Sequence, residues 1–76
     1  MEQMMPLAFA RTGDKVLVAR IVGNEEGKKH LEDLGFVSGA EIRVISTHSG
    51  NLIIKIKDTS LALVKEMASR IMVSAA

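Results

Sequence analysis

The chain has 76 residues and no cysteine, so neither a disulfide nor a thiolate metal site can stabilise its fold. A chain this short forms one domain and buries only about 60–65% of the surface that its unfolded form exposes. A deep substrate cavity is therefore not expected. Phe9 and Phe36 are the only aromatic residues. The sequence predicts a small domain with an aliphatic core.

The scarcity of aromatic residues and the charge balance exclude several classes of function. Single-stranded nucleic acids and proline-rich peptides are bound on aromatic surfaces, and two phenylalanines cannot build one. The formal net charge is +1, so a strong phosphate-attracting field is not expected, and we predict no nucleic-acid partner. No apolar run approaches the roughly 20 residues of a membrane span, and the N-terminus does not resemble a signal peptide. We expect a cytoplasmic protein that is not inserted in a membrane.

Two segments carry the signals of β-structure. Residues 15–22 are rich in β-branched side chains and lie between two glycines, which predicts a strand. Simple alternation would place Val16, Val18 and Arg20 on one face of it. Residues 41–47 and 52–57 alternate apolar and polar side chains around residues 48–51, which predicts a hairpin with one buried face.

Residues 24–34 carry helix signals at both ends. Asn24 is a suitable N-cap. Gly35 stands where a left-handed residue closes a helix, and Phe36 would then contact Leu31 as in a Schellman motif. Residues 37–40 predict a type II turn, with Gly39 supplying the positive φ that this turn requires.

The C-terminal segment permits two interpretations. Residues 60–72 fit the period of a single helix. Residues 61–64 also fit a strand that is followed by one or two helical turns over 65–70 and by a last strand over 71–74. Periodicity does not decide between them in segments this short, although closing a barrel would remove exposed sheet edges.

Three segments, in order along the chain, resemble the FeoA family of ferrous-iron-uptake accessory proteins. The central one runs from Leu31 to Val44 and matches the family's leucine, leucine-glycine-apolar and x-proline-glycine pattern, with Ser38 at the proline position. The second is Ser60-Leu61-Ala62-Leu63 followed by Glu66 to Val73, where Val64 replaces a residue that is frequently basic. The third is Pro6-Leu7 before Gly13-Asp14-Lys15. The hairpin segment Ser49 to Leu52 departs from the family's usual leucine-glycine-aspartate-proline.

The resemblance implies a mainly β fold. It is a small SH3-like five-stranded barrel, with a helix inserted after the first strand and a short helical turn before the last strand. It favours the strand–turn–strand interpretation of the C-terminal segment. The domain would cover residues 6–76, and residues 1–5 would be a flexible extension.

The resemblance also implies a function. The chain would be a non-enzymatic accessory protein of bacterial Fe2+ uptake that docks on the cytoplasmic, GTP-binding region of the FeoB permease, itself binding neither GTP nor heme. The alternative is a metal-responsive regulatory module, because similar barrels form the C-terminal domain of diphtheria-toxin-repressor-type metalloregulators. The sequence leaves open whether the chain forms a homo-oligomer.

A metal site on the predicted helix is one hypothesis for its exposed side. Glu26, His30 and Asp33 are spaced at i, i+4 and i+7, so two carboxylates and an imidazole would share one face and could bind a divalent ion. The competing interpretation is a solvated face with ordinary Glu25–Lys29 and Lys29–Asp33 pairs. It agrees with the absence of a second histidine at ligand spacing, and no resident cofactor is expected.

The predicted helix and its exit are also the candidate partner surface, formed by Lys28, Lys29, His30, Phe36 and Val37. Phe36 would be structural instead if its ring packs the helix onto the barrel. Lys55 and Lys57, with Arg43 across the hairpin, predict a modest basic face, for which docking competes with edge protection and solubility. No nucleophile, phosphate-loop or dinucleotide motif is present, so no catalytic residue is predicted and we do not expect an enzyme.

Overall fold

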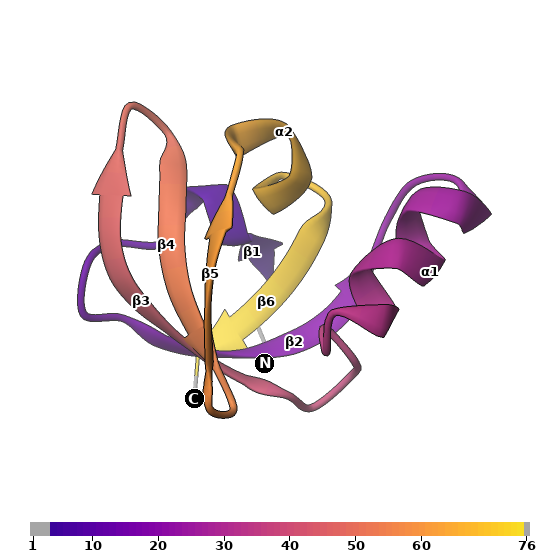
Figure 1. The fold of residues 1–76 in the computed structure, drawn as a ribbon, viewed down its shortest axis with the longest axis horizontal. Helices are drawn as coiled ribbons and strands as arrows, with labels where there is room; N and C mark the ends of the chain where they lie inside the picture. The colour runs from indigo at the N-terminus through magenta and orange to yellow at the C-terminus, as the bar shows by residue number, and fades with distance from the viewer. Residues whose placement is uncertain (1–3, 76) are drawn as a thin grey trace.

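The computed structural model describes residues 4–75 and shows a strongly curved antiparallel sheet with short helices at its margins (Figure 1). The strand order is β1-β6-β2-β3-β4-β5. No helix in residues 4–75 is long and apolar enough to cross a membrane. The elements follow one another as β1 Met5–Pro6, the 3₁₀ turn η1 Leu7–Phe9, β2 Lys15–Ile21, α1 Glu25–Asp33, β3 Glu41–His48, β4 Asn51–Ile56, β5 Thr59–Leu63, α2 Lys65–Ala68 and β6 Ile71–Ala75.

The mainly β, SH3-like architecture that the sequence predicts is confirmed, with two differences in detail. A short strand, β1, precedes the predicted ones, and its Met5 pairs with Val73 of β6. The barrel also stays open, because β1 and β5 are the two ends of the strand order among the described residues. Of the predicted flexible extension over residues 1–5, residues 1–3 lie outside the described residues.

The predicted alternation of β2 is wrong beyond its middle. Val16 and Val18 are buried as expected, but Arg20 is exposed and Ile21 is buried in its place. The register with β6 shifts between Val18 and Arg20. A bulge adds one residue to a strand without a partner opposite it, and so reverses the facing of every later side chain. This irregularity lies just before the chain leaves the sheet for α1.

The hairpin of β3 and β4 is tighter than predicted and has the buried face that its alternation indicates. Only Ser49 and Gly50 connect the strands, and both have positive φ, at 52° and 85°. Two successive residues of positive φ form a turn whose twist matches that of the flanking strands. The predicted type II turn before β3 is also present, with Gly39 at φ 88° and the Ala40 N–H donating to the Val37 carbonyl at 2.9 Å.

The C-terminal segment adopts the strand–turn–strand arrangement. β5 and β6 are separated by a single turn of helix, α2, whose Ala68 is buried. α2 also receives a link from the hairpin, since the Asn51 Oδ1 accepts from the Lys65 N–H at 3.0 Å. All buried residues of the described chain are apolar, and Phe36 is the largest of those that are fully buried. The aliphatic core that the composition predicts is therefore confirmed.

Candidate docking surface

The C-terminal end of α1 is closed by the Schellman motif that the sequence predicts. Gly35 has φ +112°, and its N–H donates to the Glu32 carbonyl at 3.0 Å. The Phe36 N–H donates to the Leu31 carbonyl at 3.1 Å. These two bonds satisfy carbonyls that a helix end leaves unpaired. They also bring the side chains of Leu31 and Phe36 together, where both are buried.

The N-terminal end of α1 is capped locally and lies beside a side chain from the far end of the chain. The Asn24 Oδ1 caps the helix by accepting from the Gly27 N–H at 2.8 Å. Arg70 then lies against both glycines of this turn: a Cβ at Gly23 would lie 3.6 Å from its Cδ, and one at Gly27 would lie 3.3 Å from its Nη1. Its Nη2 also pairs with Glu66 at 3.5 Å. The absence of side chains at Gly23 and Gly27 therefore gives Arg70 room beside the start of α1.

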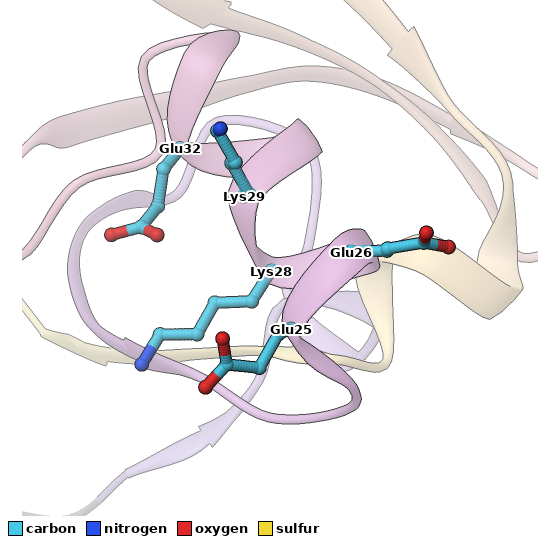
Figure 2. A pocket seen from close by; sticks show the side chains of 5 residues that line it. All are labelled: Glu25, Glu26, Lys28, Lys29 and Glu32. Atoms are coloured by element: carbon cyan, nitrogen blue, oxygen red, sulfur yellow. The ribbon is translucent and has the colours of Figure 1, made fainter.

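α1 itself presents a charged surface of mixed sign. Leu31 is the only residue of the helix that is buried. Figure 1 shows α1 standing to one side of the curved sheet, and Figure 2 shows five of its side chains fanning outward, with Glu26 pointing away from Glu25 and Lys28. The five charged residues line a shallow surface hollow: Glu25, Glu26, Lys28, Lys29 and Glu32. The helix therefore offers most of its surface to solvent.

The structure divides the predicted partner-binding residues into two groups. Lys28, Lys29 and His30 are exposed on α1, and Val37 is exposed just after it. Phe36 is fully buried in the core, with 0% of its surface exposed. Its ring therefore packs the helix exit onto the barrel and is not available to a partner. This is the structural alternative that the sequence left open.

An apolar spot beside the helix exit adds one residue to the candidate surface. Leu34 is 38% exposed and Val37 is 43% exposed, and the two lie on either side of the turn at Gly35. The spacing of Leu34 from Leu31 fits the apolar stripe of an amphipathic helix. Leu34 is the C-cap residue, one position beyond the last residue of α1, and the barrel leaves it partly exposed.

The three residues of the predicted metal site are not brought together. Glu26, His30 and Asp33 are exposed on α1, and no group of three histidine or acidic side chains in residues 4–75 is arranged to hold a metal ion. The alternative Glu25–Lys29 and Lys29–Asp33 ion pairs are also not formed within 4.0 Å in this part of the chain. Metal binding by this face stays a prediction.

The basic face that the sequence predicts lies on the outer surface of the hairpin. Arg43 and Lys55 are directly opposite each other on β3 and β4, which confirms their predicted proximity. Together with Lys57 they line a hollow at the base of the hairpin. This face is formed by the sheet and does not include α1.

The chain folds into a curved antiparallel sheet with one inserted helix, and Gly35 and Phe36 close the C-terminal end of that helix. This architecture defines a small SH3-like domain. The FeoA domain model matches residues 5–75, so the chain belongs to the FeoA family, which is associated with Fe(2+) transport. A relative from Methanocaldococcus jannaschii, named "Putative Fe(2+) transport protein A", is 34% identical over 70 residues, which cover 92% of this chain and 85% of that protein.

Solved structures show the same fold. The crystal structure of an iron uptake regulatory protein (FeoA) is similar with a TM-score of 0.85 and 32% identity, over 93% of this chain and 95% of that one. A manganese-dependent transcriptional repressor is similar with a TM-score of 0.89 and 22% identity. There the match covers 100% of this chain but 44% of the repressor. The second likeness is therefore one of fold.

Proposed function

We propose that this protein is a non-enzymatic accessory protein of Fe2+ uptake, which acts in the cytoplasm by docking on the cytoplasmic region of a FeoB-type permease. Membership of the FeoA family supports the connection with Fe2+ transport. The docking surface in this proposal is α1 with its exit, where Lys28, Lys29, His30, Leu34 and Val37 are exposed. The GTP-binding domain of the permease would supply the complementary surface.

The single observation that carries this proposal is the way α1 is attached. A helix of nine residues is too short to be stable in water without tertiary contacts, yet α1 buries only Leu31 of its own residues. Its ends are nevertheless closed by a side-chain cap and a Schellman motif. A helix that is fixed at its ends and exposed along its length adds little to the core, and is suited to contact a partner.

The test is calorimetric titration of this protein into the GTP-binding domain of a FeoB-type permease from the same organism, with and without guanine nucleotide. We expect binding that the double variant Lys28→Glu/Lys29→Glu weakens at least tenfold. The matched control is Arg43→Glu/Lys55→Glu, which reverses the same number of charges on the sheet and should bind as the unaltered protein does. No binding at high micromolar concentration would refute direct docking. Equal loss in both variants would refute the assignment to α1.

A second candidate function is metal-responsive regulation, which the fold likeness to the manganese-dependent repressor favours. In that case the protein would bind a divalent metal through Glu26, His30 and Asp33. Titration with Fe(II), Mn(II) and Zn(II) distinguishes the two candidates. Micromolar binding that is lost in His30→Ala supports this one, and heats equal to those of dilution refute it.

A further inference from the structure

Three cations stand in a line across the outer face of the sheet. In the strand register Lys15 of β2 is opposite Arg43 of β3, and Arg43 is in turn opposite Lys55 of β4. Lys15 is neutralised by Glu41, whose Oε1 lies 3.4 Å from its Nζ. Arg43 and Lys55 make no ion pair within 4.0 Å in residues 4–75. The line therefore presents uncompensated positive charge.

Protection of a sheet edge does not explain this arrangement. Lysines are commonly placed on edge strands, where they discourage pairing with another chain. Here Arg43 and Lys55 lie on β3 and β4, which are interior strands, while the edge strand β5 carries no charged residue. Like charges directly opposite each other destabilise a sheet. The repulsion between Arg43 and Lys55 therefore costs stability at a place where these two cations protect no sheet edge.

A row of apolar side chains runs beside the cations on the same face. Two residues further along β3 and two residues back along β4 are Ile45 and Ile53, which are 44% and 47% exposed. Ile53 is opposite Ala62 of β5, which is also exposed. On β4, Ile53 and Lys55 are two residues apart, so they share one face and lie roughly 6.6–6.8 Å apart. On β3 the register with β4 shifts between Val44 and Ser46, so Ile45 lies in a bulge next to Ser46, which is opposite Ile53, and its exposure places it outside the core. The outer face thus carries a cationic row and an apolar row side by side.

We propose that this two-row face, defined by Arg43, Lys55, Ile45, Ile53 and Ala62, binds an extended segment of a partner protein in which acidic and aliphatic residues alternate. Successive side chains of an extended chain point to opposite sides. A segment lying along the boundary of the rows would direct its carboxylates to the cations and its aliphatic groups to the isoleucines.

The base of the hairpin provides a place for one of these carboxylates. A hollow of about 310 Å3 lies there, lined by Ala40, Glu41, Arg43, Lys55 and Lys57. Glu41 is the only acid in its lining, and it is already paired with Lys15. Hydrogen-bonded pairs of carboxylate with arginine or lysine are stronger than neutral hydrogen bonds. Binding of one carboxylate in this hollow would fix the register of the bound segment.

Other anionic partners fit this face less well. Nucleic acids are held by many phosphate contacts or by stacking on aromatic rings, and this face has no aromatic residue because Phe36 lies in the core and Phe9 on η1. Anionic membranes are bound through clusters of about 4–8 basic residues. Arg43, Lys55 and Lys57 are three. An acidic protein segment uses both rows, whereas phosphate groups would use the cations alone.

The experiment is an NMR titration of the ¹⁵N-labelled protein with a capped hexapeptide of alternating glutamate and valine at low salt. We expect saturable shifts of the amides around Arg43, Ile53 and Lys55, and at least a tenfold weaker dissociation constant in Arg43→Glu/Lys55→Glu. Lys28→Glu/Lys29→Glu serves as the matched control and should bind unchanged. Because the probe is a peptide, this result does not depend on docking to the permease.

Two further peptides separate recognition of the pattern from simple attraction. A peptide with glutamine in place of glutamate tests the charge, and one with three glutamates followed by three valines tests the alternation. Both should bind at least fivefold more weakly than the alternating peptide. The inference is overturned if the alternating peptide causes no shifts at millimolar concentration, if the shifts map to α1, or if the block peptide binds equally well. Binding of vesicles or DNA in preference to the peptide would also overturn it.

Discussion

Replacing Gly35 with alanine should measure the free-energy cost of placing an L-residue at the left-handed position that closes α1. Gly35 has φ +112°, a conformation that side chains of L-residues rarely adopt. The nearest atom that an added Cβ would meet is the Ile56 Cδ1, at 3.8 Å, which is an ordinary van der Waals distance. No clash contributes, so the cost is that of the backbone conformation alone. That cost is about 1–2 kcal/mol.

This loss is large for so small a protein. A domain of this length has a total stability of roughly 4–11 kcal/mol at about 0.05–0.15 kcal/mol per residue. One kcal/mol lowers the melting temperature of a domain of 60–100 residues by about 4–8 °C. Gly35→Ala should therefore melt roughly 4–16 °C below the unaltered protein. Thermal unfolding and urea unfolding, both followed by circular dichroism, measure this loss of stability.

Gly27→Ala is the matched control within the same helix. Gly27 does not have positive φ, and alanine improves helix propensity there by about 0.8–1.0 kcal/mol. The new Cβ would lie 3.1 Å from the Asn24 Oδ1 and 3.3 Å from the Arg70 Nη1. Those contacts oppose the gain, although the Arg70 side chain is 42% exposed and can move. We expect a stability close to that of the unaltered protein. If both variants lose the same stability, or if Gly35→Ala loses none, the reasoning about Gly35 is wrong.

Three further predictions concern the attachment of α1, the cationic row and the hairpin turn. Leu31→Ala should cost about 2–5 kcal/mol, because the side chain is 1% exposed, and hydrogen exchange should show the amides of α1 losing protection first. Lys55→Glu should raise stability in urea by about 0.2–1 kcal/mol, since it places an opposite charge across from Arg43; a loss would contradict the repulsion that we infer. Gly50→Ala should be destabilising, because its φ is +85° and a Cβ would lie 2.8 Å from the Lys65 Cδ. Adding Lys65→Ala should recover only the steric part, and full recovery would contradict a cost from the backbone.

Local signals in the sequence were sufficient where a structure is set by neighbouring residues. The cap at Asn24, the closure at Gly35 and the turn at Gly39 all appear as predicted. Each depends on residue types whose conformational preferences act within four or five positions. The buried alternation of the hairpin was predictable for the same reason, because one face of a strand repeats every second residue.

Features that depend on contacts between distant segments could not be read from the sequence. The bulge near Ala19 follows from the pairing of β2 with β6, and it exchanged the expected roles of Arg20 and Ile21. Periodicity assumes an uninterrupted strand and cannot detect an inserted residue. The contact of Arg70 with the start of α1 joins residues more than forty positions apart. A glycine at position 27 is unfavourable in the interior of a helix, and it indicates a close approach there without identifying the side chain that makes it.

The two candidate surfaces differ in charge pattern, and this difference gives each a distinct dependence on salt. α1 interleaves both signs, with three glutamates and two lysines around its hollow, whereas the sheet face carries uncompensated charge of one sign at Arg43 and Lys55. Attraction to a surface of one sign is progressively screened as the Debye length falls from about 10 Å at 0.1 M salt to about 3 Å at 1 M. A mixed surface has little net field to screen, and its charges mainly fix the register of the partner. Binding of an acidic segment to the sheet should therefore weaken steeply with salt, while docking through α1 should change little. If both decline equally, net charge governs both contacts and the two surfaces are not distinct in their recognition.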